Sequence, residues 1–239
     1  MWENWKPRYM QIVRRLNIDP KADENAARVL EGLLPESDLS GLKKIVHGRE
    51  CVIFGAGPSL ETDLEKLERG GYLDYVLISA DGATSAVLKY RNPEVIVTDL
   101  DGYVDDQVRA WKDGSWMVVH AHGDNIHQIL QIVPKLKGRV VGTTQIKPFG
   151  KLFNFGGFTD GDRAAFMAHG LGASKIYLAG MDFGTEVGKF SGQKNPARKA
   201  IKLRICRELL SWLARDMGAK IVNLSKMSNS PRRKRRERS

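Results

Sequence analysis

The first 48 residues of the chain carry apolar side chains at the spacing of an amphipathic α-helix. Two series recur at intervals of three and four positions, namely Trp5, Tyr9, Ile12, Val13 and Leu16, and then Ala26, Ala27, Leu30, Leu33 and Leu34. The pair Asp19-Pro20 separates the two series, and Pro35 follows the second. Residues 1–48 are therefore predicted to form a helical N-terminal extension that packs on the main domain.

From residue 49 the pattern changes to short apolar runs that alternate with amphipathic segments. Strands are predicted at 51–54, 75–79, 94–98, 116–119, 139–141, 175–179 and 220–223. Helices are predicted at 60–69, 161–170 and 197–217. Such alternation is typical of a parallel sheet with helices on both faces. Residues 49–228 are therefore predicted to be an α/β domain built on a doubly wound, mostly parallel, Rossmann-like sheet.

Acidic residues follow several of the predicted strands. Asp99 and Asp101 end the strand in the run Val97-Thr98-Asp99-Leu100-Asp101-Gly102, and Asp81, Asp124 and Asp182 each follow another. The carboxyl ends of parallel strands share one edge of a sheet, so these carboxylates are expected to lie together. A single one could be a helix cap, but five on one edge repel one another and need a cation. The pattern predicts a site for Mg²⁺ and phosphate.

A glycine turn follows the first predicted strand. The segment Gly55-Ala56-Gly57-Pro58-Ser59 resembles a dinucleotide fingerprint, but Leu60 stands where that fingerprint has its third glycine. Gly55, Gly57, Pro58 and Ser59 are predicted to grip a phosphate or a ribose, because the glycines leave backbone N–H groups open to an anion. Asp81 lies near the position of a ribose-binding acid, so a dinucleotide site is an alternative.

The segment His120-Ala121-His122-Gly123-Asp124-Asn125 resembles the metal motif of metallo-β-lactamases, in which the last position is normally histidine. That fold consists of two facing β-rich sheets, and the β/α alternation of this chain does not fit it. The interpretation that we favour keeps Asp124 as a carboxylate ligand of the metal and Asn125 as a polar contact with the nucleotide.

Three further segments carry polar groups whose role the residues leave open. The glycine-rich segment 154–163 either begins a helix, with Thr159 or Asp160 as its N-cap, or closes over a ligand with Asp160, Asp162 and Arg163. Lys199 and Lys202 either bind phosphate oxygens or belong to a solvated basic face. Residues 184–195 lack apolar periodicity and form either a lid over the site or a surface loop.

Composition and charge narrow the class of protein. The 239 residues have a net charge of +10, and 42% of them are hydrophobic, which suffices for one large domain. Basic residues crowd the C-terminal end, so 229–239 are predicted to be a disordered basic tail. Nucleic acid is nevertheless not the expected partner, no membrane segment is expected, and a homo-oligomer is possible. Cys51 and Cys206 are expected to be buried free thiols, which indicates a cytoplasmic location.

Six motifs occur in a fixed order: Gly-Ala-Gly-Pro-Ser-Leu at 55–60, Ala-Asp-Gly-Ala at 80–83, Val-Thr-Asp-Leu-Asp-Gly at 97–102, His-Ala-His-Gly-Asp-Asn at 120–125, Gly-Gly-Phe-Thr-Asp-Gly-Asp-Arg-Ala at 156–164 and Gly-Met-Asp-Phe at 180–183. This ordered set resembles the archaeal 6-hydroxymethyl-7,8-dihydropterin pyrophosphokinase family. The resemblance covers roughly residues 45–225 and includes a helical N-terminal region.

Thiamine pyrophosphokinases are more distantly similar. Their aspartates bind Mg²⁺ next to the phosphates of ATP, and the residues that match by position here are Asp81, Asp99, Asp101 and Asp124. The chain departs from their pattern at Gly102, which replaces a serine, and at Thr98, which replaces a glycine.

The resemblance implies a diphosphokinase whose catalytic domain is 49–228. It would transfer pyrophosphate from ATP to the hydroxymethyl group of a reduced pterin and release AMP, in methanopterin-type cofactor synthesis. Catalysis of such a transfer rests mainly on positioning and on charge neutralisation. The alternative is a transferase of another type that binds a nucleotide or dinucleotide on the same fold.

Roles for individual side chains follow from the same resemblance. Asp99, Asp101 and Asp124 would hold Mg²⁺, and Asp101 would be the first candidate for the general base. Positive charge near the phosphates would come from Arg163 and from Lys199 or Lys202. The amino-pyrimidine edge of the pterin would be bound by a carboxylate, with the candidates Asp160, Asp162 and Asp182.

Overall fold

A computed structural model describes residues 1–35, 39–183, 189–190 and 196–226 of the chain. The predicted basic tail at 229–239 and most of the segment expected as a lid, 184–195, lie outside the described residues.

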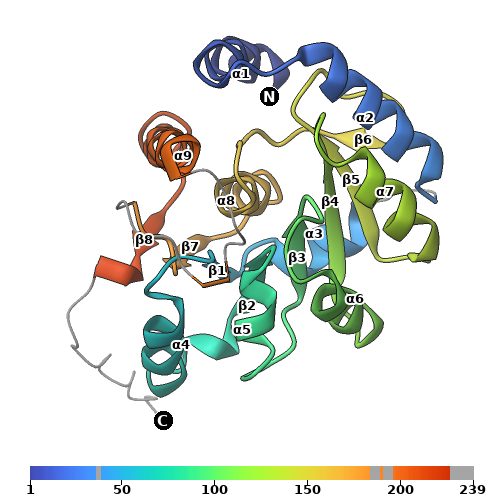
Figure 1. Ribbon diagram of the computed structural model, residues 1–239. Coiled ribbons are helices and arrows are strands. Elements are labelled where there is room, and N and C mark those ends of the chain that lie inside the picture. The colour runs from blue at the N-terminus through green and yellow to red at the C-terminus, as the bar shows by residue number, and fades with distance from the viewer. Residues whose placement is uncertain (36–38, 184–188, 191–195, 227–239) are drawn as a thin grey trace.

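An eight-stranded sheet forms the centre of the molecule (Figure 1). Its strands, in chain order, are β1 (Glu50–Phe54), β2 (Val76–Ala80), β3 (Val95–Thr98), β4 (Trp116–Ala121), β5 (Val140–Thr144), β6 (Leu152–Phe153), β7 (Lys175–Ala179) and β8 (Ile221–Asn223). The spatial order is β6-β5-β4-β3-β2-β1-β7-β8, and every neighbouring pair is parallel. The predicted α/β fold with a parallel sheet is confirmed, and β6 is the strand that the pattern missed.

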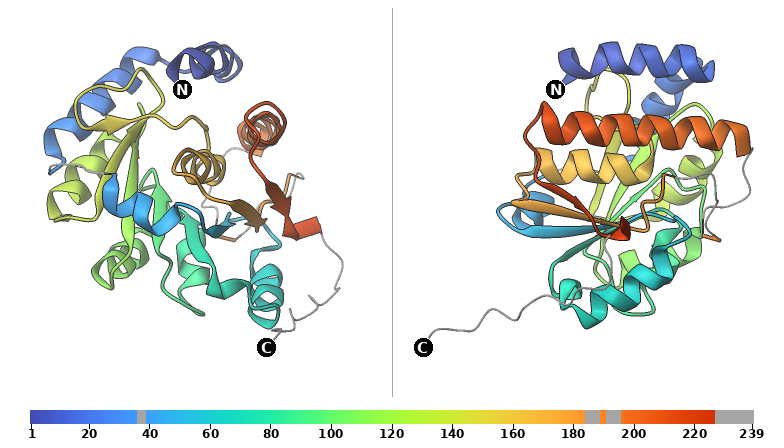
Figure 2. Two further views of the ribbon diagram at one scale, coloured as in Figure 1. Left: turned by 180° about the vertical axis from the view of Figure 1, so that it is seen from behind. Right: turned by 90° about the vertical axis from the view of Figure 1, so that its left-hand side faces the viewer.

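Helices cover both faces of this sheet. One face carries α1 (Trp2–Leu16), α3 (Ser40–Val46), α8 (Asp160–Gly170) and α9 (Pro196–Arg215). The other face carries α2 (Pro20–Leu33), α4 (Leu60–Arg69), α5 (Ala83–Val87), α6 (Val104–Lys112) and α7 (Ile126–Ile132). Every residue of β2 and β3 is buried, as expected for central strands covered on both sides. Figure 2 shows α1, α9 and α8 stacked over one face and α4 below the other.

The predicted helical N-terminal segment is present and is joined closely to the sheet. Asp19 caps α2, since its side chain accepts a hydrogen bond from the Lys21 N–H at 2.9 Å, and Pro20 occupies the first helical position. Trp5 on α1 is fully buried, and its indole N–H donates to the Gln145 carbonyl at 2.8 Å. The helix α2 packs mainly against α7 and β5. The extension is thus part of the same packed body as the sheet.

The order of the strands reverses direction at β1. The chain runs outward from β1 to β6 on one side, and then returns to place β7 and β8 on the other side. In parallel α/β sheets, ligands bind beyond the carboxyl ends of the strands at such a switch point. The loops that follow β1, β2, β3, β4 and β7 are therefore the place to look for a site. Within the described part of the chain, no helix combines the length and the apolar composition needed to cross a membrane.

Candidate active site

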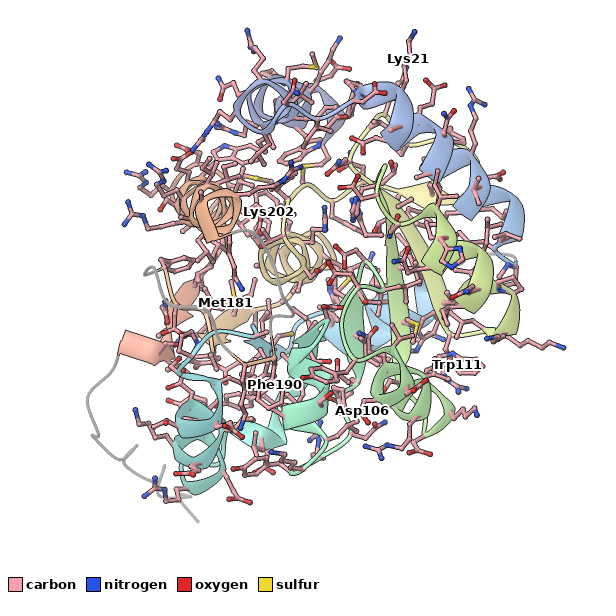
Figure 3. The ribbon with its side chains drawn as sticks, viewed as in Figure 1. Lys21, Asp106, Trp111, Met181, Phe190 and Lys202 are labelled. Atoms are coloured by element: carbon pink, nitrogen blue, oxygen red, sulfur yellow. The ribbon has the colours of Figure 1, made fainter. Side chains whose placement is uncertain are left out.

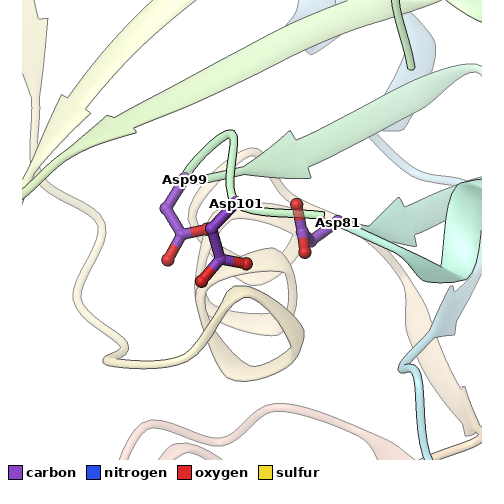
Figure 4. A group of neighbouring side chains, drawn as sticks. All are labelled: Asp81, Asp99 and Asp101. Atoms are coloured by element: carbon purple, nitrogen blue, oxygen red, sulfur yellow. The ribbon is translucent and has the colours of Figure 1, made fainter. Parts of the chain in front are cut away.

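Three carboxylates meet at the carboxyl ends of β2 and β3. Asp81 follows β2, and Asp99 and Asp101 follow β3. One carboxylate oxygen from each of them lies within 4.8 Å of the others, and Figure 4 shows the three side chains turned toward a common space. We call Asp81, Asp99 and Asp101 the acid group. Its members come from adjacent strands, as the edge of a parallel sheet requires.

The backbone between Asp99 and Asp101 explains how both side chains reach one site. Leu100 has a left-handed conformation with φ of 64°, which is unusual for a residue with a branched side chain. Its N–H donates to the Thr98 hydroxyl at 2.8 Å, and its side chain is 1% exposed in the core. The turn at Leu100 buries the leucine while the two aspartates beside it face the same space.

Asp81 is oriented by three hydrogen bonds to one of its oxygens. Oδ1 accepts from the Thr98 hydroxyl at 2.9 Å, from Gln107 Nε2 at 3.0 Å and from the Gly102 N–H at 3.2 Å. A Cβ at position 102 would lie 2.3 Å from Asp81 Oδ2, so a glycine is needed there. Gly102 and Thr98, which depart from the thiamine pyrophosphokinase pattern, are therefore two of the three residues that hold Asp81.

Electrostatics within the acid group favour a bound cation. Burial, followed by the negative charges of Asp99 and Asp101, raises the pKa of Asp81 to about 7. Burial and the same acidic neighbours, Asp99 first, also raise the pKa of Asp160 well above its usual range, against the lowering effect of Arg163. A divalent cation would remove this repulsion, and clustered carboxylate oxygens are the ligands that Mg²⁺ takes. The donor set therefore fits Mg²⁺.

The loop after β4 borders the acid group but does not place Asp124 in it. Asp124 is exposed, and among the described residues it is not part of the group of side chains close enough together to hold a metal ion. His122 comes closer, with Nε2 3.1 Å from Asp99 Oδ2. Its Nδ1 accepts from the Asp124 N–H at 3.3 Å, so the Nε2 proton points to Asp99. Of the three expected metal ligands, Asp99 and Asp101 thus lie in the acid group, whereas its third member is Asp81 and Asp124 lies beside it.

Asn125 uses its side chain to join two loops. Its Nδ2 donates to the carbonyls of Asp99 at 2.8 Å and His120 at 2.7 Å, and its Oδ1 accepts from the His122 N–H at 3.0 Å. The residue is buried. These hydrogen bonds fix the loops after β3 and β4, and the nucleotide contact of Asn125 stays a prediction.

The glycine turn after β1 does not present the open amides that we expected. The N–H groups of Gly55, Gly57 and Ser59 are bonded to Ala179 O at 2.9 Å, Gly180 O at 2.8 Å and Asp182 Oδ2 at 3.0 Å. Asp182 Oδ2 also lies 2.9 Å from the Ser59 hydroxyl. A Cβ at Gly57 would lie 2.3 Å from that same carboxylate oxygen. The glycines therefore serve the close packing of the loops after β1 and β7, while Gly55, Gly57 and Pro58 also line the larger of the two cavities described below.

The start of α8 separates two aspartates that the sequence treated alike. Asp162 is fully buried and forms a capping box with Thr159, with oxygens that accept from the N–H groups of Phe158 at 2.7 Å and Thr159 at 2.8 Å. Asp160 instead faces the cavity described below and accepts from Arg163 Nη1 at 3.1 Å. Asp162 is thus a helix cap, and Asp160 keeps the geometry of a ligand-binding group.

Two cavities meet beside the acid group. The larger has a volume of about 420 Å³ and the smaller about 240 Å³. The residues that line both are Asp99, His122, Asp124, Arg198, Lys199 and Lys202. Asp81, Asp160 and Arg163 also line the larger cavity, and Figure 3 labels Lys202 together with two further lining side chains, Met181 and Phe190. Asp101 and Asn125 line the smaller cavity. Lys199 and Lys202 thus line both cavities, and their contact with phosphate oxygens stays a prediction.

Several polar residues at the site were not predicted from the sequence. Asp23, on the N-terminal helix α2, and Gln145 both line the larger cavity. Both side chains are buried. Arg198 shares the position of Lys199 and Lys202 at the start of α9. A buried aspartate on an apolar helix face was the available signal for Asp23, because such a charge needs partners.

Known proteins similar to this chain share one description. A family model described as 6-hydroxymethylpterin diphosphokinase MptE-like matches residues 24–188. A Pyrococcus furiosus protein named 6-hydroxymethyl-7,8-dihydropterin pyrophosphokinase is 44% identical over 234 residues, which cover 94% of this chain and 99% of the relative. Proteins of the same name from Methanothermobacter thermautotrophicus and Methanocaldococcus jannaschii are each 41% identical, and cover 92% and 79% of this chain and 97% and 83% of their own.

Among solved structures, the chain is similar to the MAf glycosyltransferase from Magnetospirillum magneticum, with 17% identity and a TM-score of 0.36 over 72% of this chain and 29% of the other. That similarity is too low to indicate a function. The family match and the three archaeal relatives agree with each other. The chain therefore belongs to the MptE-like family of 6-hydroxymethylpterin diphosphokinases and is a diphosphokinase.

Proposed function

We propose that the chain transfers a pyrophosphoryl group from Mg²⁺-bound ATP to the hydroxymethyl oxygen of 6-hydroxymethyl-7,8-dihydropterin. The products would be AMP and the pterin diphosphate, an intermediate of methanopterin-type cofactor synthesis. The observation that carries the proposal is the position of the acid group at the junction of two cavities, with Asp99 lining both. A reaction between two substrates across a metal needs this arrangement. The names of the relatives supply the pterin.

The metal is assigned to the acid group. Asp81, Asp99 and Asp101 would hold Mg²⁺, which supplies charge neutralisation to the phosphate oxygens when it is bound. Asp81 Oδ1 is occupied by its three donors, so this carboxylate would offer Oδ2. His122 donates to Asp99 Oδ2 and would hold this carboxylate in a fixed orientation.

The triphosphate is assigned to the space between the acid group and the start of α9. Arg198, Lys199 and Lys202 line both cavities and would contact phosphate oxygens. Arg163 is 7% exposed and faces the larger cavity beside Asp160. Its charge would stabilise the negative charge that develops on the transferred group.

The pterin is assigned to the larger cavity. Phe158, Met181 and Phe183 offer an apolar wall for a flat ring, and Asp160 offers a carboxyl group for its amino-pyrimidine edge. In the transfer, the alcohol oxygen bonds to the β-phosphorus, the bond from that phosphorus to the oxygen of the departing AMP breaks, and the alcohol proton passes to a carboxylate. Asp101 lines only the smaller cavity, so it can take this proton only if the alcohol reaches the boundary between the cavities.

The test is a product analysis with the purified full chain, ATP, Mg²⁺ and 6-hydroxymethyl-7,8-dihydropterin. The expected nucleotide product is AMP in equal amount to pterin diphosphate, and chelation of Mg²⁺ by EDTA should stop the reaction. Formation of ADP, or turnover that continues without a divalent cation, would contradict the proposal. A dinucleotide-dependent transfer has less support, because the amides of the glycine turn are bonded within the protein.

A further inference from the structure

A buried carboxylate on the N-terminal helix α2 reaches into the active site. Asp23 is 1% exposed and lines the larger cavity. It accepts hydrogen bonds from the Tyr9 hydroxyl at 2.6 Å, from Gln145 Nε2 at 2.7 Å and from the Gly123 N–H at 2.9 Å. Burial of a carboxylate is costly even with such partners, and an apolar side chain would serve helix packing better. The arrangement therefore calls for a role beyond the packing of α2.

The hydrogen bonds of Asp23 extend in two directions, which we call arms, and one arm leads to Arg163. Because Gln145 donates its amide N–H to Asp23, its carbonyl oxygen faces the other way and accepts from Arg163 Nη2 at 3.3 Å. Arg163 Nη1 donates to Asp160 at 3.1 Å. The charge of Asp23 thus fixes the orientation of the Gln145 amide, and that amide fixes one side of the guanidinium.

The other arm leads to the loop after β4. The Gly123 N–H is bonded to Asp23 Oδ1, and a Cβ at position 123 would lie 2.6 Å from the Cβ of Ala22. The loop therefore lies directly against the start of α2. Its next residue toward β4, His122, faces Asp99 of the acid group.

We propose that Asp23 is a positioning residue for the transfer, which holds Arg163 and the His122–Asp124 loop in place around the acid group. The inference rests on the function proposed above. It makes the N-terminal helices part of the active site, although the family match begins at residue 24. Asp23 itself touches neither the reacting group nor the metal in this assignment.

A pair of exchanged side chains tests the arm to Arg163. Asp23→Asn offers one acceptor oxygen where the wild type has two, so either the Gln145 N–H or the Gly123 N–H must face the N–H group of the new amide. We expect kcat to fall by about 10- to 100-fold, the range for a small displacement of a catalytic group, with the KM for ATP nearly unchanged. Gln145→Glu should cause a similar fall, because it places two carboxylates together.

In the double variant Asp23→Asn/Gln145→Glu, the new amide N–H faces the new carboxylate, and the amide oxygen remains available to the Gly123 N–H. The new carboxylate accepts from both the new amide and Arg163, so kcat should recover to within about threefold of the wild type. Tyr9→Phe is the matched control, since it removes one donor to Asp23 and leaves both arms intact. Its kcat should stay close to the wild-type value.

The midpoint of thermal unfolding, measured for each variant, shows whether a loss of kcat follows from a loss of stability. A wild-type kcat in Asp23→Asn, or a double variant that regains its midpoint without regaining kcat, would overturn the proposal. Hydrogen exchange of residues 120–125 gives a readout that does not depend on substrate, and Asp23→Ala should accelerate it at Gly123. Unchanged exchange would overturn the loop arm. If the wild type forms no AMP, the proposed function fails, and the exchange measurement still tests Asp23.

Discussion

Two regions at the same edge of the sheet carry polar motifs, and their side chains are used in opposite ways. The acid group after β2 and β3 brings together three carboxylates, and burial, followed by the charges of Asp99 and Asp101, raises the pKa of Asp81. The glycine turn after β1 bonds its N–H groups to the loop after β7 and meets the carboxylate of Asp182. The carboxyl ends of the strands determine where ligand groups lie. Which groups remain available depends on the hydrogen bonds that the protein makes with itself.

The largest loss of activity is expected when Asp99, in the acid group, is replaced. Asp99→Asn should lower kcat by about 10²- to 10⁴-fold, because it removes a charge that would hold the metal and the phosphates together. The measurement is AMP formation at saturating substrates. The matched control is Asp124→Asn, at an exposed carboxylate outside the acid group, which should change kcat by less than about tenfold. Equal losses in both variants would return Asp124 to the ligand set.

A substitution in the glycine turn should mainly lower the stability of the protein. Gly57→Ala places a Cβ 2.3 Å from Asp182 Oδ2 and 2.5 Å from Gly180 O, and should cost about 1–3 kcal/mol in the free energy of unfolding. Urea unfolding measures this cost. Gly32→Ala, in an open position on α2, is the control and should stabilise by up to about 1 kcal/mol. A normal stability for Gly57→Ala would contradict the close packing of the two loops.

The acid group should also make stability depend on pH and metal. The pKa of Asp81 is raised to about 7 in the folded chain, above its unfolded value of about 4. The folded state then binds more protons between these values, so the metal-free protein should lose stability as the pH rises from about 4 to about 7. Mg²⁺ at pH 8 should restore stability. Thermal midpoints in EDTA and in Mg²⁺ measure this, with Asp81→Asn as the comparison.

The loss of stability with rising pH should be absent in Asp81→Asn, since this variant has no carboxyl group to titrate at that position. The same pH dependence in wild type and variant would show that Asp81 is not its source.

The smallest effect is expected at Asp182. Asp182→Asn keeps an oxygen that can accept from the Ser59 N–H and hydroxyl, so it should cost no more than about 1 kcal/mol of stability. Its kcat should change by less than about fivefold. A loss comparable to that of Asp99→Asn, measured in the same AMP assay, would place a catalytic function at the glycine turn.

The sequence predicted the sheet because buried strands are short apolar runs, such as those of β2 and β3. The strand β6 was missed, since two residues carry no periodicity. The edge that bears Asp81, Asp99 and Asp101 was also predictable, because strand ends coincide in a parallel sheet.

The roles of single residues were harder to predict from the sequence. The place of Asp81 in the acid group depends on hydrogen bonds from Thr98 and Gln107, which no linear pattern encodes. The helix cap at Asp162 could be read from the Thr159 spacing, but a ligand loop has the same composition. The long-range contacts of Asp23 arise only when α2 packs on the sheet.

The central claim, that the acid group holds the metal and the glycine turn does not, is tested most directly by Mn²⁺ binding. Mn²⁺ would stand in for Mg²⁺, and electron paramagnetic resonance would follow its titration into protein saturated with a non-hydrolysable ATP analogue. We predict that Asp99→Asn weakens Mn²⁺ binding by at least about tenfold, while Asp182→Asn binds it like the wild type. Unchanged binding in Asp99→Asn, or an equal loss in Asp182→Asn, would contradict the account.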